Sequence, residues 1–271
     1  MKSSNPVLGR ISAAAQQPRY SVPGQGAPAG YPQADGQGYG YPEVVQTGHA
    51  DRMTIDDVVV KTVTLLAITA VSAAITWALV PLEMVRTVWW AAAILGLVVG
   101  LVISFAQVTN VAVIAGYAVV EGVFLGAVSK AYEYLFEGIV LQAVIATLGV
   151  FLAMALLYKA KIIRATPKFM KVVIGIAAGL GIVMLVNVVL YFVTGSVGPL
   201  RDGGPIAIGF SLVCIVVAAL MFVVNFKQIE DGVAAGLPRK YGWLGAFGML
   251  VELVWMYLEF LRLLSYLQGD D

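Results

Sequence analysis

Seven apolar stretches of about 20 residues each constrain the fold of this 271-residue chain more than any other feature. Helices of about 20 apolar residues cross the ~30 Å hydrocarbon core of a bilayer, and only helices and closed barrels satisfy their own backbone there. We therefore predict an all-α membrane protein, a bundle of seven transmembrane helices. The predicted spans lie near residues 58–80, 88–106, 111–131, 139–158, 172–194, 206–226 and 243–267.

Composition excludes several other classes of protein. Hydrophobic residues make up 60% of the chain and charged residues 12%, whereas soluble domains carry about 25% charged residues. A single cysteine, Cys214, and a single histidine, His49, leave no disulfide framework, no Cys-based or His-based metal site and no Ser-His-Asp triad. We therefore expect a protein that is not an enzyme and has no cofactor. We expect it to interact with the lipid bilayer and not with a nucleic acid.

The first 52 residues differ in composition from the rest. Residues 16–42 are rich in Gly, Pro, Gln and Tyr and contain no apolar run. Such a segment buries too little surface to offset the entropy of ordering, and no apolar core follows Lys2 as a signal peptide would require. We expect residues 1–52 to form a disordered cytoplasmic tail and residues 53–271 to form the membrane domain.

The distribution of basic residues predicts the orientation of the chain. With seven spans, 13 of the 17 Lys and Arg residues fall on the side of the N-terminus. Cytoplasmic loops carry an excess of Lys and Arg, so we expect the N-terminus inside and the C-terminus outside. The other side holds Arg86, Lys130, Arg201 and Arg262.

Two GxxxG pairs predict close packing between helices. Gly96 and Gly100 lie in the second span, and Gly122 and Gly126 in the third. Small residues at this spacing allow helix backbones to approach closely in lipid, and we expect contacts within one chain rather than a dimer interface. The mixed charges of residues 227–242 predict a solvated interfacial turn.

The seventh span carries ionisable residues at membrane depth. Glu252 and Glu259 are seven residues apart and share one helical face, and a charge at this depth costs ~2.5–3.5 kcal/mol on insertion scales. Glu259 either pairs with Arg262 at i,i+3 or Arg262 extends outward, and Glu252 either hydrogen-bonds to a neighbouring helix or faces a pathway. Together with Glu121 in the third span, these acids suggest a cation or proton path through the bundle.

Several stretches resemble one family of membrane proteins, the Bax inhibitor-1/YccA family, and in particular its bacterial branch. The similar segments cover most of residues 55–267 and a short N-terminal tag. They are SSNPVL near the start, GYAVVEGVFLGAVSKAYE at 116–133, YKAKIIRATPKF at 158–169, and ALMFVVNFKQIEDGVAAGLPRKYGWLGAFGMLVELVWMYLEFLRLLSYL at the end.

The resemblance implies a Bax inhibitor-1-like bundle with a central helix, in the cell inner (plasma) membrane. Some members of the family are pH-sensitive calcium leak proteins whose sensor is a pair of carboxylates in the sixth and seventh spans. The seventh-span position falls on Glu259 in MYLE, the candidate calcium-facing residue, and the sixth-span position falls on Asn225 in VVNFKQI. Asn225 does not titrate but can hydrogen-bond to Glu259, and Glu252 is the candidate to replace the missing acid.

Two functions follow as hypotheses. The first is a calcium leak gated by carboxylate protonation, along a path that involves Glu121, Asn225, Glu252 and Glu259. The alternative is a non-conducting regulator that binds other membrane proteins, such as a membrane-bound quality-control protease that grips the N-terminal tail. A secondary transporter fits less well, because the sequence shows no inverted repeat.

Overall fold

The structure, a computed structural model, describes residues 52–196 and 198–269 as a bundle of α-helices. Seven helices in this part of the chain are long and apolar enough to cross a membrane, and each contains or closely matches one predicted span. The predicted fold is confirmed, whereas the tail predicted for residues 1–52 lies, except for Arg52, outside the described residues. The helices are α2 (Ile55–Leu79), α3 (Leu82–Ala106), α4 (Val111–Leu135), α5 (Ile139–Lys159), α6 (Pro167–Thr194), α7 (Pro205–Ala234) and α8 (Tyr241–Gln268).

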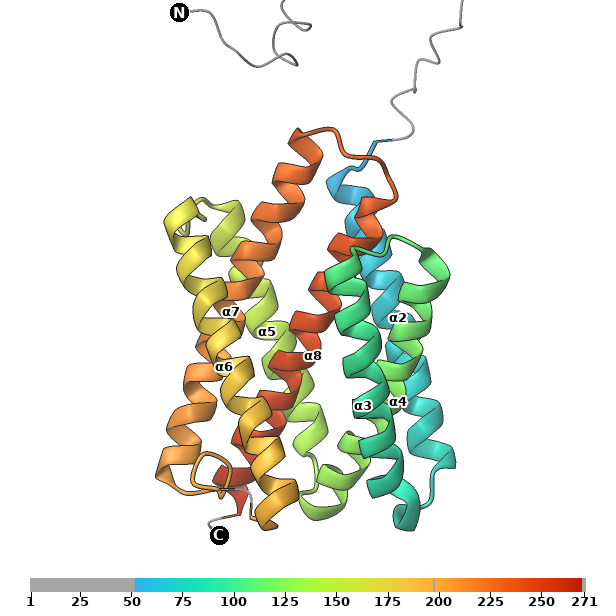
Figure 1. The fold of residues 1–271 in the computed structure, drawn as a ribbon, viewed down its shortest axis with the longest axis vertical. Coiled ribbons are helices and arrows are strands. Elements are labelled where there is room, and N and C mark those ends of the chain that lie inside the picture. The colour runs from blue at the N-terminus through green and yellow to red at the C-terminus, as the bar shows by residue number, and fades with distance from the viewer. Residues whose placement is uncertain (1–51, 197, 270–271) are drawn as a thin grey trace, which may run out of the picture. The chain divides into compact units, whose positions relative to one another are not determined.

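Helix α8 is the central helix of the bundle. It runs between a group formed by α2, α3 and α4 and a group formed by α5, α6 and α7 (Figure 1). In its most apolar 18-residue window 61% of residues are buried, against 6% in α6, the helix with the fewest buried residues. Polar residues on α8 are therefore held inside protein rather than in lipid.

Successive helices run in opposite directions, so their ends gather at two levels (Figure 1). The Arg52 end contains the start of α2 and the turns before α4, α6 and α8. The Arg201 end contains the turns before α3, α5 and α7 and the last turn of α8. We call these two ends of the bundle the Arg52 end and the Arg201 end.

Helix α7 is longer than the sequence predicts. It continues past residue 226 to Ala234, so the interfacial turn expected over 227–242 is wrong for its first half. Lys227 pairs with Asp231 at 2.7 Å and with Glu230 at 3.7 Å, at i,i+4 and i,i+3 spacings that stabilise a helix outside the apolar core. The turn itself is confined to residues 235–240.

The glycine pair of α4 packs against α2 within the chain, as predicted. A Cβ atom on Gly122 would lie 2.5 Å from the backbone oxygen of Thr69 and 2.5 Å from the Cβ of Ser72. A Cβ atom on Gly126 would overlap the backbone oxygen of Ala73. Only glycine permits this approach of the two backbones, which places α2 and α4 in one tightly packed unit beside α8.

Candidate functional site

Glu259 of α8 lies in a cluster with two arginines. Its side chain is 1% exposed. Arg262 donates from Nη1 to Oε1 at 2.7 Å, which confirms the i,i+3 pair. Arg201, on the turn between α6 and α7, donates from Nη2 to Oε1 at 3.1 Å and from Nη1 to Oε2 at 3.2 Å. This second arginine was not predicted, because a turn residue has no periodicity that points to a partner.

The environment of Arg201 holds its turn against the bundle. Its guanidinium carbon lies 5.0 Å from the centre of the Phe210 ring on α7, and the hydroxyl of Tyr266 donates to its backbone oxygen at 3.4 Å. Two guanidinium groups against one carboxylate leave the cluster with a net positive charge. In this conformation both oxygens of Glu259 are occupied, so it presents no free ligand to a calcium ion.

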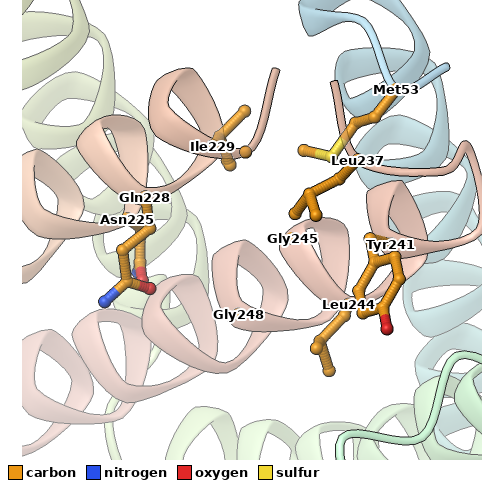
Figure 2. A pocket seen from close by; sticks show the side chains of 10 residues that line it. Met53, Asn225, Gln228, Ile229, Leu237, Tyr241, Leu244, Gly245 and Gly248 are labelled. Carbon is orange, nitrogen blue, oxygen red and sulfur yellow. The ribbon is translucent and has the colours of Figure 1, made fainter. Parts of the chain in front are cut away.

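Asn225 does not reach Glu259, and the predicted hydrogen bond between them is wrong. Asn225 lines a cavity of about 160 Å³ near the Arg52 end, together with Gln228 and Tyr241 (Figure 2). Its Oδ1 lies 3.7 Å from the point where a Cβ on Gly248 would be. Glu259 is eleven residues further along α8, about 16 Å at 1.5 Å per residue. Because α7 and α8 are antiparallel neighbours, a residue late in α7 meets the early part of α8.

Glu252 lies between these two levels. It is one turn after Gly248 and two turns before Glu259, on the same face of α8. Its side chain is 4% exposed, and its Oε1 has no hydrogen-bond partner among the described residues. We call Gly248, Glu252, Trp255 and Glu259 the α8 stripe. Glu252 rather than Glu259 is therefore the acid on this stripe nearest the level of Asn225.

Two further buried polar atoms on α7 and α8 lack a partner within the described part of the chain. They are the hydroxyl of Ser211 on α7 and the indole nitrogen of Trp255 on the α8 stripe. Buried polar atoms are nearly always hydrogen-bonded, so each exception calls for an explanation. Together with Glu252, these unpaired polar atoms all lie on α7 and α8, so the contact between these two helices is not purely apolar.

Glu121 is separate from the other acids. It accepts a hydrogen bond from the hydroxyl of Tyr117 at 2.8 Å, and its Oε2 lies 3.2 Å from the point where a Cβ on Gly96 would be. A Cβ on Gly100 would likewise lie 3.2 Å from the Tyr117 ring. The glycines of α3 therefore accommodate α4 side chains within the chain. Glu121 lies between α3 and α4, apart from Glu252 and Glu259 on the α8 stripe, and the cation path through these acids stays a prediction.

Comparison with known proteins decides the family. A family model described as Bax inhibitor 1 like matches residues 5–269. The chain belongs to the Bax inhibitor-1-like family. A search of curated proteins finds no match. With its seven apolar helices, this member of the family is a multi-pass membrane protein.

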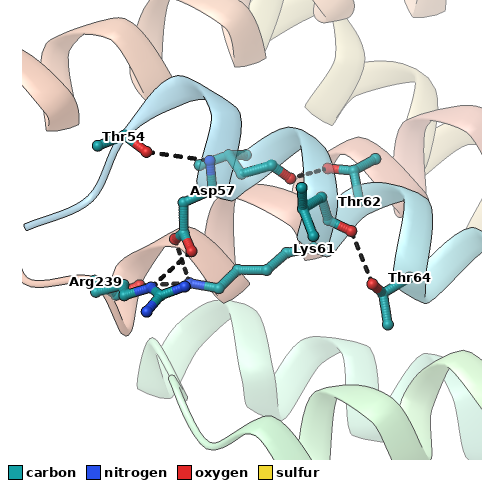
Figure 3. Close-up of polar contacts among 8 residues, drawn as sticks. Thr54, Asp57, Lys61, Thr62, Thr64 and Arg239 are labelled. Atoms are coloured by element: carbon teal, nitrogen blue, oxygen red, sulfur yellow. Dashed lines mark hydrogen bonds and ion pairs between the residues drawn. The ribbon is translucent and has the colours of Figure 1, made fainter. Parts of the chain in front are cut away.

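A second ion cluster lies at the Arg52 end of this Bax inhibitor-1-like bundle (Figure 3). Asp57, in the first turn of α2, pairs with Lys61 one turn later and accepts a hydrogen bond from Arg239 Nε at 2.8 Å. Lys61 also donates to the backbone oxygen of Arg239 at 2.7 Å. A Cβ on Gly242 would lie 2.7 Å from Asp57 Oδ2, so a larger residue here would displace the Asp57 carboxylate. The cluster ties α2 to the turn before α8.

Charged clusters therefore anchor both ends of the central helix. The i,i+4 spacing of Asp57 and Lys61 is visible in the sequence, but the participation of Arg239 is not. No group of three or more His, Cys, Asp or Glu side chains within the described ranges is arranged to hold a metal ion. The chemistry that these clusters can support is ion pairing between elements, made or broken as the elements move.

Proposed function

We propose that this protein is a gated cation leak, with the α8 stripe along its path and the contact of Arg201 with Glu259 as its closure. One observation carries the proposal: a fully buried carboxylate on the central helix is held by an arginine from a turn rather than from another transmembrane helix. Turns open at lower free energy than packed helices, so this contact is the place where the bundle can change state.

Release of Arg201 would change the electrostatics of the path. The two arginines give the cluster a net positive charge, which repels a cation. Without Arg201 the cluster is neutral and one oxygen of Glu259 is free to contact a passing ion. Carboxylate oxygens are ligands that calcium prefers, and the family resemblance makes calcium the first ion to test.

We further propose that Asn225 reduces the response of this member to pH. An amide does not titrate, so Asn225 cannot share a proton with an acid. Its position beside Gly248, one turn from Glu252, makes Glu252 the acid that a carboxylate at position 225 would meet. Asn225→Asp therefore introduces a second titratable group at the same level of the α8 stripe.

Calcium flux into proteoliposomes at pH 6 and pH 8 tests these proposals. We expect Arg201→Gln to increase the flux, Glu259→Gln to alter it, and Asn225→Asp to make it depend on pH. Arg164→Gln removes one exposed positive charge from the turn between α5 and α6 and should leave the flux unchanged. Flux equal to that of empty liposomes for the native chain, Arg201→Gln and Asn225→Asp at both pH values would overturn the leak.

We also propose the orientation of the bundle and the membrane in which it lies. The excess of Lys and Arg on the side of the N-terminus supports an inside location for the Arg52 end, in a cell inner (plasma) membrane. Accessibility of a single cysteine introduced on the turn at residues 235–240, in a Cys214→Ser background, tests this in intact cells. Labelling by a membrane-impermeant maleimide from outside would contradict it.

A regulator that binds other membrane proteins is the second candidate function. Helix α6 favours it, because Val173 is its single buried residue and many of its other side chains are exposed to lipid or to a partner. A photo-crosslinker at position 179, where a Cβ has open space, should then give a specific protein adduct. Adducts with lipid alone, and an unchanged partner set after deletion of residues 1–50, would count against this function.

A further inference from the structure

Helices α3 and α6 approach each other at the Arg201 end through long side chains alone. No Cα atom of α3 lies within 8 Å of one in α6. Trp90 of α3 stacks on Tyr191 of α6 with ring centres 6.2 Å apart and contacts Phe192 at 5.1 Å. Arg86 Nη2 donates to the hydroxyl of Tyr191 at 3.2 Å. The separation of the backbones leaves a crevice between the two helices.

A cavity of about 470 Å³ lies at this end of the bundle, lined by residues of α3 and α4 and by Tyr191 of α6. One charged residue, Arg86, lines it together with the aromatic rings of Trp89, Trp90, Tyr134 and Tyr191. The rest of the lining is aliphatic and includes Val85 and Leu135 from α3 and α4. Its volume lies within the range of about 300–1,000 Å³ that is typical of small-molecule sites, and its lining suits a ligand with one charged group and an apolar body.

The charge of Arg86 has no counter-ion in the described part of the chain. No Asp or Glu oxygen there lies within the 4.0 Å of an ion pair, whereas Arg201, Arg239 and Arg262 each have a carboxylate partner. A guanidinium stays charged at all ordinary pH values, and its planar donors match the oxygens of a phosphate. Arg86 therefore offers its remaining donors to an anion from outside the chain.

The position of the cavity at the helix ends favours a lipid headgroup as the source of that anion. Arg86 lies in the second turn of α3, Tyr134 in the last turn of α4 and Tyr191 in the last turn of α6. Aromatic and basic residues at helix ends mark the level of lipid headgroups, and the planar donors of an arginine match the oxygens of a headgroup phosphate. A free phosphate ion would leave the apolar lining uncovered, but a lipid covers both parts.

We propose that this cavity binds one phospholipid, with its phosphate on the guanidinium of Arg86 and one acyl chain along the aliphatic and aromatic lining. The lipid would lie against α3 and α4 and contact Tyr191 of α6. This matters for the architecture because the backbone of α6 approaches only that of α7 closely, and α6 meets α3 through side chains. The proposal does not depend on ion conduction.

Native mass spectrometry of the full chain released from detergent tests the site. The probes are phosphatidylglycerol, phosphatidylethanolamine and a glucosyl diacylglycerol, all with the same acyl chains, and inorganic phosphate alone. We expect both phospholipids to bind in one copy and the phosphate-free glycolipid to bind at least about tenfold more weakly, the effect of one lost charge-assisted hydrogen bond. Arg86→Gln should reduce phospholipid binding by a similar factor, whereas Arg164→Gln should not.

Each other result overturns the proposal. Equal retention of the glycolipid would show an apolar groove without phosphate recognition, and binding of inorganic phosphate as tight as that of the lipids would show a simple anion site. Unchanged binding by Arg86→Gln would exclude the guanidinium. If that variant does not fold, Arg86→Lys keeps the charge but loses the planar fork, and it should bind phospholipid more weakly than the native chain. Native-like binding by Arg86→Lys would then overturn the site.

Discussion

Arg201 and Glu259 form a two-point contact across 58 residues of sequence, with each guanidinium nitrogen on a different carboxylate oxygen. Arg262 adds a third hydrogen bond from the same helix as Glu259. The carboxylate of Glu259 thus has one hydrogen-bonding partner from its own helix, Arg262, and one from a distant turn, Arg201. The second partner makes the conformation of the turn before α7 depend on a residue of the central helix.

Arg201→Gln should destabilise the bundle. Removal of one partner of a buried ion pair costs about 3–5 kcal/mol, and we expect the lower end of this range because Arg262 still pairs with Glu259. Unfolding of the variant in mixed micelles measures the loss. In a double-mutant cycle with Glu259→Gln, the combined variant should lose less free energy of unfolding than the two single variants added together. Additive losses would show that the contact contributes no coupling.

Gly126→Ala should weaken the packing of α4 on α2. The added Cβ would overlap the backbone oxygen of Ala73 and lie 2.8 Å from the Cβ of Thr76, and overpacking typically costs about 1–3 kcal/mol. Gly116→Ala is the matched control, because the same helix has open space there. The control should be neutral or up to about 1 kcal/mol more stable, since alanine is the better helix former. Equal thermal stability of the two variants would contradict the close approach of these helices.

Lys130→Met should loosen the end of α2. The ammonium group of Lys130 on α4 donates to the backbone oxygens of Trp77 at 2.8 Å and Val80 at 2.7 Å, where α2 has no further turn to satisfy them. We expect a loss of about 1.5–3 kcal/mol, the usual contribution of hydrogen bonds to a charged group. Lys168→Met, at an exposed position early in α6, should be nearly neutral. A native free energy of unfolding for Lys130→Met would show that Lys130 does not cap α2.

The helices were predictable because hydrocarbon thickness sets their length, and the sequence shows that length directly. The last turns of α7 were missed for the same reason, since Lys227, Glu230 and Asp231 end the apolar run while their ion pairs continue the helix. The glycine contacts were predictable as close packing, but not the identity of the partner. Spacing alone does not show that Gly96 faces Glu121 or that Gly126 faces Ala73.

The candidate site was predictable on one helix and not between helices. The pair of Glu259 with Arg262 follows from their i,i+3 spacing, which is visible in the sequence. The level at which α7 meets α8 depends on the length of their connecting turn and on how far α7 extends, and both were misjudged for residues 227–242. The family resemblance implied that Asn225 lies beside Glu259, whereas it lies beside Gly248. Arg201 and Arg239 act from turns, where no periodicity indicates a direction.

Asp57→Asn should release the turn before α8 from α2. The substitution removes the charge that holds both Lys61 and Arg239, and the amide of Met53, which donates to the backbone oxygen of Leu237 at 2.8 Å, reports on the same connection. We expect amide hydrogen exchange of Met53 and of residues 237–243 to accelerate roughly fivefold, equivalent to about 1 kcal/mol, because Arg239 is largely exposed and its pair is screened by solvent.

Asp56→Asn is the matched control for this prediction. It removes the same charge from the same first turn of α2, and therefore the same interaction with the helix dipole. The side chain of Asp56 is exposed. It takes no part in the ion pairs and hydrogen bonds of Asp57, Lys61 and Arg239. Exchange at residues 237–243 should therefore stay native in Asp56→Asn. If both variants accelerate exchange to the same extent, the effect comes from the charge at the start of α2, and the cluster does not hold the turn.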